Sequence, residues 1–339
     1  MMGTTFGDMS KRLALQRQGS GLKQAVRNLS QEMTTGIVRD KSNRVNGEFS
    51  KLAGIKGAIG MASARKASAQ FAGTIFSMQQ SILADLGKHA QNGFLDQTIH
   101  SPIMSSAEIS RSIGVMESTF QNAVSQLNTE LGGRTLFAGT TGDSAALIGA
   151  DAILAEISDS LIAAYPAGPD VEEASAFIAN WFSDSGQYAT LAYRGGPPIP
   201  ARLDLGHGMT VGFEITAQDS DIREFLGALA LGAVLSKGLF EADQGRQHAM
   251  LQNASLGLGK AQTGLIALSA NLGIQEERAR EGQVRAEAEH TAMSIALAEL
   301  LEADPYDTAI RLEQTMTQLD LIYNLTARLS RLSLASYLR

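Results

Sequence analysis

Residues 127–140 read Leu-Asn-Thr-Glu-Leu-Gly-Gly-Arg-Thr-Leu-Phe-Ala-Gly-Thr, and this stretch determines how the chain is organised. A long helical pattern of apolar residues reaches Leu131 and stops at the glycine pair that follows. A short strand-like segment then runs from Thr135 to Ala138 and is closed by Gly139. The sequence therefore predicts a corner here, where an extended helical rod meets a compact domain.

Outward from this corner, apolar residues recur at spacings of three and four, which is typical of one face of a helix. Three such stripes precede the corner: Leu22, Val26, Leu29 and Met33; Ile75, Met78, Ile82 and Leu86; and Ile109, Ile113, Met116, Phe120, Ala123, Leu127 and Leu131. Glycines at 36, 47, 54, 57 and 60 loosen the pattern after the first stripe. Gly87, Gly93 and Pro102 predict the end of the second helix.

Two further helices are predicted in the second half of the chain. Leu258, Ala261, Leu265, Leu268 and Leu272 form a matching stripe, and the charged run 276–289 behind it is typical of a solvated helix surface. The last helix begins clearly, with Asp304 as N-cap and Pro305 at the first helical position. No Gly or Pro interrupts it up to Arg339.

The last helix carries apolar residues on two stripes, one through Leu312, Met316, Leu319 and Tyr323, and the other through Leu321, Leu325, Leu329, Leu332 and Leu338. Such a helix cannot bury both faces against a single partner. It is either an ordinary core helix of a bundle or a helix buried between subunits, and we favour the second. The predicted subunit-interface residues are Leu22, Val26, Leu29, Met33, Leu312, Leu319, Tyr323, Leu325, Leu329, Leu332 and Leu338.

The middle of the chain has a different pattern. A short helix is indicated near 171–181, a β-hairpin between Leu203 and Ile215, and an apolar helix from Ile222 to Phe240. The predicted fold is mainly α: an elongated, coiled-coil-like helical rod built from both chain ends, with an inserted α+β middle domain. The predicted domains are a terminal assembly domain (1–45 and 302–339), a rod domain (46–139 and 240–301) and the inserted domain (140–239).

Composition excludes several classes of protein. The chain has no cysteine, so a disulfide framework and thiolate metal sites are ruled out. Residues 1–20 lack the pattern of a signal peptide, which predicts a specialised route for any export. The longest apolar run, 225–235, is too short to span a bilayer. Twelve Lys or Arg against four acids in the first seventy residues form a basic arm, but no aromatic interleaving points to nucleic acid.

No catalytic or cofactor-binding pattern is recognisable. The five histidines are scattered, without a pair at metal-ligand spacing on a helix. The glycines around His207 have one residue too many for a dinucleotide fingerprint, and Gly257 to Lys260 lacks the spacing of a phosphate loop. The sequence therefore predicts a protein that is not an enzyme and has no metal or cofactor.

Three segments resemble the flagellin family. They are the corner 127–140, the segment 29–36 that runs from a hydrophobic stripe to Thr-Gly, and the C-terminal Leu-Ser-Leu-Ala-Ser-Tyr-Leu of 332–338. The similarity covers both terminal thirds of the chain. Residues 37–42 lack the asparagine, serine and paired aspartates expected of a filament flagellin, which favours the hook-filament junction members of the family.

This resemblance implies a structural protein of the bacterial flagellum. It would be extracellular, exported by the flagellar type III secretion system, and assembled as a ring at the junction between hook and filament. The implied partners are further copies of the chain, hook-associated protein 1, flagellin and an export chaperone that covers the apolar C-terminal segment. The alternatives are a flagellin filament subunit and a cytoplasmic coiled-coil scaffold.

Overall fold

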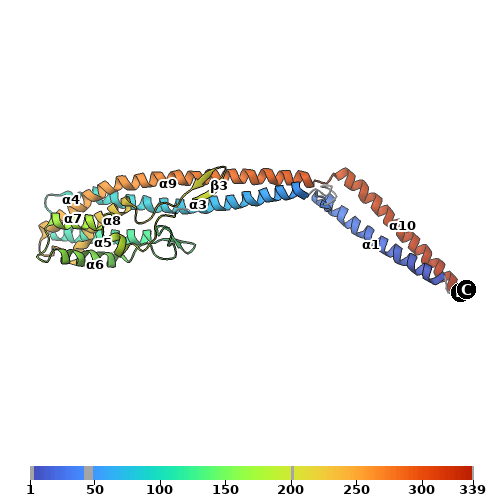
Figure 1. The fold of residues 1–339 in the computed structure, drawn as a ribbon, viewed down its shortest axis with the longest axis horizontal. Coiled ribbons are helices and arrows are strands. Elements are labelled where there is room, and N and C mark those ends of the chain that lie inside the picture. Colours follow the sequence, from blue (N-terminus) through green and yellow to red (C-terminus); the bar gives the residue numbers. More distant parts are fainter. Residues whose placement is uncertain (1–3, 42–48, 200–201, 338–339) are drawn as a thin grey trace. The chain divides into compact units, whose positions relative to one another are not determined.

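Long helices dominate the computed structural model, which describes residues 4–41, 49–199 and 202–337 (Figure 1). The four longest are α1 (Thr4–Thr35), α3 (Phe49–Leu95), α9 (Gln244–Leu301) and α10 (Pro305–Tyr337). The shorter helical elements are α4 (Gln97–His100), α5 (Ser106–Leu127), α6 (Ala150–Ala164), α7 (Val171–Trp181), η1 (Tyr188–Ala192), α8 (Ser220–Ala233) and η2 (Val234–Lys237). The mainly α fold class predicted from the sequence is confirmed.

The strands form two small antiparallel hairpins. β1 (Glu130–Leu131) pairs with β2 (Arg134–Thr135), and β3 (Leu203–Gly206) pairs with β4 (Met209–Val211). The second hairpin was predicted, and its turn has His207 and Gly208 at positive φ, as a tight hairpin requires.

The chain divides into two compact units, unit 1 (residues 1–63 and 287–339) and unit 2 (residues 64–286). These boundaries differ from the predicted domain boundaries. The predicted border between residues 45 and 46 lies outside the described residues. Whether residues 140–239 fold as a separate domain remains a prediction.

Unit 2 contains a continuous hydrophobic core. Its largest fully buried side chains include Phe76, Phe120, Phe137, Trp181 and Tyr188. They come from α3, α5, the corner, α7 and η1, so the core joins elements distant in sequence. The helices approach closely: a Cβ on Gly232 of α8 would lie 2.6 Å from the Met116 Cγ of α5. In Figure 1, α5 to α8 cluster beside α3 and α9 in this unit.

The corner differs in detail from its prediction. α5 ends at Leu127 and not at Leu131, because Asn128 is its C-cap and binds the backbone of Leu147. The Asn128 side chain accepts from the Leu147 amide at 2.8 Å and donates to the Leu147 carbonyl at 3.0 Å. Leu131 lies in β1, and the predicted strand 135–138 is reduced to β2. Gly132 and Gly133 form the turn at positive φ.

Two predicted helix ends are also wrong. α3 continues through Gly87 and Gly93 to Leu95. The helix predicted from Ile222 to Phe240 ends as α8 at Ala233, after which η2 leads to Gly238 in the left-handed region, at φ 93°.

Candidate assembly surface

The two terminal helices of unit 1 begin and end at well-defined local signals. α1 ends at Thr35. The next residue, Gly36, has a φ of 69°, outside the helical region, and its amide donates to the Glu32 carbonyl at 2.8 Å. α10 begins after Asp304, whose carboxylate accepts from the amides of Tyr306 at 2.8 Å and Asp307 at 3.2 Å. This N-cap was predicted, and it satisfies donors that the helix itself leaves free.

α1 and α10 pack as an antiparallel pair, shown side by side in Figure 1. Near the middle of both helices, a Cβ on Gly19 would lie 3.7 Å from the Ile322 Cγ2. One turn further, the Lys23 ammonium lies 5.3 Å from the centroid of the Tyr323 ring. The end of α1 meets the start of α10, because the Ala303 amide donates to the Gly36 carbonyl at 2.9 Å.

Each helix contributes one stripe with alternating spacings of four and three. All positions of the two stripes are buried or half-buried: Leu15, Gly19, Leu22, Val26 and Leu29 on α1, and Thr308, Leu312, Thr315, Leu319 and Ile322 on α10. This spacing is the signature of coiled-coil packing. Leu29 and Ile322 are only 7% and 8% exposed, whereas Leu22, Val26, Leu312 and Leu319 are half-buried.

Several residues of the predicted subunit interface are not buried in the α1–α10 contact of the single chain. Met33, Tyr323 and Leu325 are exposed. Leu329 and Leu332 belong to α10, but their side chains are not among those described, and Leu338 lies outside the described residues. Leu22, Val26, Leu29, Leu312 and Leu319 lie in this contact, together with Ile322, which was not among the predicted residues. That the predicted residues lie between subunits stays a prediction.

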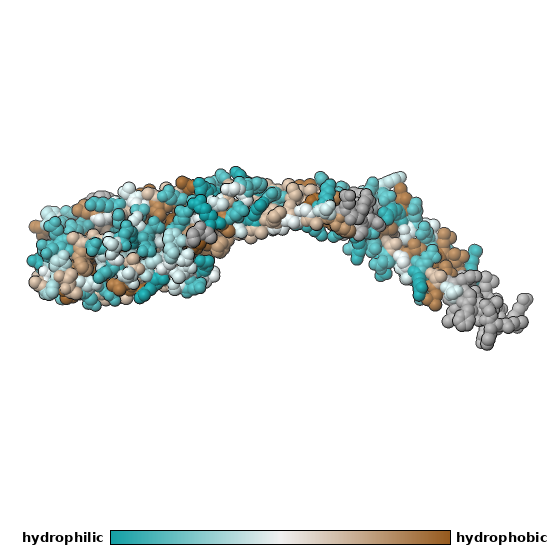
Figure 2. Space-filling model, in the orientation of Figure 1, coloured by the Kyte–Doolittle hydropathy of each residue, from teal (hydrophilic) through white to brown (hydrophobic). Residues whose placement is uncertain are grey.

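Exposed apolar side chains flank the buried stripe of α10 on both sides. Successive residues on a helix are rotated by about 100°. Leu321 and Leu325, which are 57% and 50% exposed, therefore lie on one flank of Ile322, and Met316 and Tyr323 lie on the other. Figure 2 shows brown, apolar surface on the α1–α10 pair among teal, hydrophilic residues. Pairing with α1 thus leaves both flanks of α10 uncovered.

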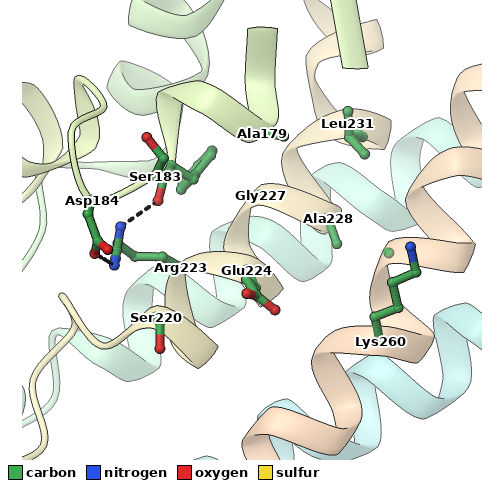
Figure 3. Close-up of a pocket in the computed structure, with 12 residues that line it drawn as sticks. Ala179, Ser183, Asp184, Ser220, Arg223, Glu224, Gly227, Ala228, Leu231 and Lys260 are labelled. Atoms are coloured by element: carbon green, nitrogen blue, oxygen red, sulfur yellow. Dashed lines mark hydrogen bonds and ion pairs between the residues drawn. The ribbon is translucent and has the colours of Figure 1, made fainter. Parts of the chain in front are cut away.

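A second candidate site is a hollow of about 550 Å³ in unit 2, lined by α7, α8 and α9 (Figure 3). Its lining includes the apolar residues Phe182 and Leu231 and the charged residues Glu224 and Lys260. Arg223 is buried in its wall and forms an ion pair with Asp184.

The Arg223 guanidinium also donates to the carbonyls of Phe182 at 2.8 Å and Gln218 at 2.9 Å. Arg223 therefore connects the segment after α7 to the start of α8. Its positive charge is compensated within the chain by the ion pair with Asp184. Beside it, burial raises the pKa of Asp219, and the neighbouring Asp221 acts in the same direction. We assign this wall a structural role.

Two features are absent from the residues that the structure describes. In residues 4–41, 49–199 and 202–337 there is no group of three or more His, Asp or Glu side chains placed to hold a metal ion. Within the same ranges, none of the helices combines the length and the apolar character needed to cross a bilayer.

Comparison with known proteins gave limited similarity. No family model matches the chain, and no curated protein matches it. Among solved structures, a protein of Vibrio parahaemolyticus provisionally assigned as a flagellar hook-associated protein is similar over 79% of this chain and 95% of its own. Its sequence is 13% identical, and the TM-score is 0.29.

Proposed function

We propose that the chain is a structural subunit of the bacterial flagellum, a hook-filament junction protein of the hook-associated protein 3 type. It assembles as a ring between hook-associated protein 1 and the flagellin filament. The observation that carries the proposal is the incompletely covered α1–α10 pair, formed by the two chain ends in which the flagellin-like segments 29–36 and 332–338 lie.

The energetics of this pair favour association with further helices. Fully burying a leucine-sized side chain contributes about 1.5–3 kcal/mol. Leu321, Leu325 and Met316 keep about half of their surface in water in the single chain. Because these residues flank the buried stripe on both sides, α10 can accept a neighbouring helix on each flank. Identical head-to-tail contacts of this kind generate rings or helical arrays.

The same exposed residues of α10 are the surface that the proposed export chaperone would cover. A helix with two uncovered apolar flanks is prone to non-specific association before assembly. A chaperone that covers α10 until export would prevent this. The absence of cysteine means that folding after export needs no oxidising step. We propose no enzymatic activity and no cofactor.

Two alternatives remain for the same surface. A flagellin filament subunit would use it in the filament itself, and a cytoplasmic coiled-coil scaffold would use it to bind a helical partner. The junction protein is favoured because residues 37–42 depart from the pattern of filament flagellins.

Electron microscopy of cells that lack this chain tests the proposal. We expect hooks without filaments, with flagellin released into the medium, and filaments restored by a plasmid copy. Hooks without filaments and a medium free of any flagellin would favour the filament subunit. Intact flagella on the deletion cells would contradict any role in the flagellum.

A further inference from the structure

Two short connectors of unit 1 are paired with each other. Residues 36–38 follow α1, and residues 301–303 lead into α10; we call the two together the clasp. Ile37 and Glu302 form an antiparallel bridge. The Val38 amide donates to the Leu301 carbonyl at 2.9 Å, and the Ala303 amide donates to the Gly36 carbonyl at the same distance.

Glu32, in the last turn of α1, forms a hydrogen bond to the residue that follows the clasp. The buried Glu32 carboxylate accepts from the Arg39 amide at 2.7 Å, across the turn made by Gly36. The Arg39 guanidinium also reaches back to the Gln31 side chain. Hydrogen bonds to a charged acceptor are stronger than neutral ones, and a buried carboxylate left without its donors is costly.

On the other side, the clasp continues directly into the first turn of α10. Asp304 follows the clasp and holds the amides of Tyr306 and Asp307 with its carboxylate. Its carbonyl accepts from the Thr308 amide at 2.9 Å. An unbroken series of hydrogen bonds therefore runs from the last turn of α1 through the clasp to the first turn of α10.

We propose that the clasp couples the two terminal helices, so that α1 and α10 become ordered together. Among the side chains that the structure describes, few large ones are buried between these helices, and most of the stability of a helix in a protein comes from tertiary packing. When the clasp forms, it fixes the register between α1 and α10. Because it holds the end of α1 next to the start of α10, the two helices then dock in a local, intramolecular step. The assembly surface is then presented as a pair. This last consequence rests on the proposed function, whereas the coupling itself does not.

A disulfide across the clasp tests the coupling. In the bridge between Ile37 and Glu302 the hydrogen bonds belong to the residues on either side, which places the two Cα atoms about 4.5 Å apart. This separation suits a disulfide. Both side chains are exposed, and the chain has no other cysteine. The variant is Ile37→Cys with Glu302→Cys, and the single variant Ile37→Cys is its control.

Hydrogen exchange of dilute monomer is compared between the oxidised and the reduced double variant. Oxidation should slow the exchange of amides along both α1 and α10 by about ten-fold or more, and reduction should reverse this. The single variant should not respond to either treatment. Slower exchange confined to residues near 36–38 and 301–303, with both helices unchanged, would overturn the coupling.

Glu32 provides an independent variant without a cross-link. Glu32→Ala removes the acceptor, whereas Glu32→Gln keeps a carbonyl oxygen at that place. Glu32→Ala should speed exchange in α10 as well as in α1 by roughly ten-fold, and Glu32→Gln should do so much less. An effect of Glu32→Ala limited to α1 would refute the coupling. A locked protein with both helices ordered that stays monomeric at high concentration would count against the proposed function alone.

Discussion

The hydrophobic core of unit 2 and the helix pair of unit 1 are built from similar residues, but the apolar side chains are buried to different degrees. In unit 2, Phe76, Phe120 and Trp181 are fully buried among side chains from many elements. In the α1–α10 pair, Leu29 and Ile322 are buried, while Leu321 and Leu325 remain about half exposed. The core of unit 2 is thus buried within one chain, whereas the α1–α10 pair leaves apolar side chains exposed, which is the basis of the proposal that it binds a neighbouring chain.

The largest expected effect is a cavity in unit 2. Phe120→Ala removes a fully buried ring, and such truncations cost about 3–5 kcal/mol of unfolding free energy. Val115→Ala on the same helix alters an exposed side chain and should change stability by about 0.5 kcal/mol or less. Urea denaturation measures both. Equal costs for the two variants would contradict the claim that the buried side chains of unit 2 provide its stability.

A large effect is also expected at the corner that closes the core. Gly139 has φ 62°, and a Cβ there would lie 2.4 Å from the Pro197 carbonyl oxygen. Gly133 has φ 79° with open space around it. Gly133→Ala should cost about 1–2 kcal/mol from backbone strain alone, and Gly139→Ala should cost more. Thermal unfolding of the two variants separates strain from crowding, and an equal loss would show that the close approach does not matter.

Tyr188 should contribute an intermediate amount that depends on pH. Its hydroxyl donates to the buried Ala217 carbonyl at 2.6 Å. Tyr188→Phe leaves that carbonyl unpaired and should cost about 1–3 kcal/mol. Tyr165→Phe is the matched control, because Tyr165 is half-buried and its hydroxyl has no hydrogen-bond partner among the described residues.

Burial also raises the pKa of Tyr188 well above its ordinary value, with Tyr193 acting in the same direction. A raised pKa means that the folded state keeps a proton that the unfolded state loses. The contribution of Tyr188 is therefore complete below about pH 10 and is lost as the pH rises beyond it. The decline in stability above pH 10 should be shallower in Tyr188→Phe. An unchanged alkaline slope would refute this role.

The smallest effect on the single chain is expected in unit 1. Leu325→Ala truncates a half-exposed side chain, so the unfolding free energy of the dilute monomer should change by about 0.5 kcal/mol or less. Urea denaturation at low concentration measures it, with Phe120→Ala as the reference for a buried site. A cost comparable to that of Phe120→Ala would mean that α10 is already enclosed within one chain.

The sequence predicted those elements that depend on local signals. The start of α10 at Asp304 and Pro305 was correct, and the hairpin predicted between Leu203 and Ile215 forms but ends at Val211. Caps and tight turns are determined by neighbouring residues. The glycines of α3 were misleading. Gly93 was interpreted as a helix end, but a Cβ there would lie 2.4 Å from Leu258 Cδ1, so this glycine serves close packing against α9. A tertiary contact of this kind leaves no local signal.

The contact stripe of α10 was only partly predicted, because threonines interrupt its hydrophobic pattern. The Thr315 hydroxyl donates to the carbonyl of Arg311 at 2.6 Å. With its hydroxyl satisfied by the helix backbone, a threonine can occupy a contact position with its methyl group. Hydropathy alone favoured the leucines at 321 and 325, which the structure leaves on the exposed flank.

Filament formation by cells that carry Leu325→Asp tests most directly whether the exposed apolar flanks of α10 form the assembly surface. The matched control is Ile162→Asp, at an exposed position of α6 in unit 2. Deletion cells complemented with Leu325→Asp should export the protein but show hooks without filaments by electron microscopy, whereas Ile162→Asp should restore filaments. Normal filament numbers with Leu325→Asp would show that this surface is not needed for assembly.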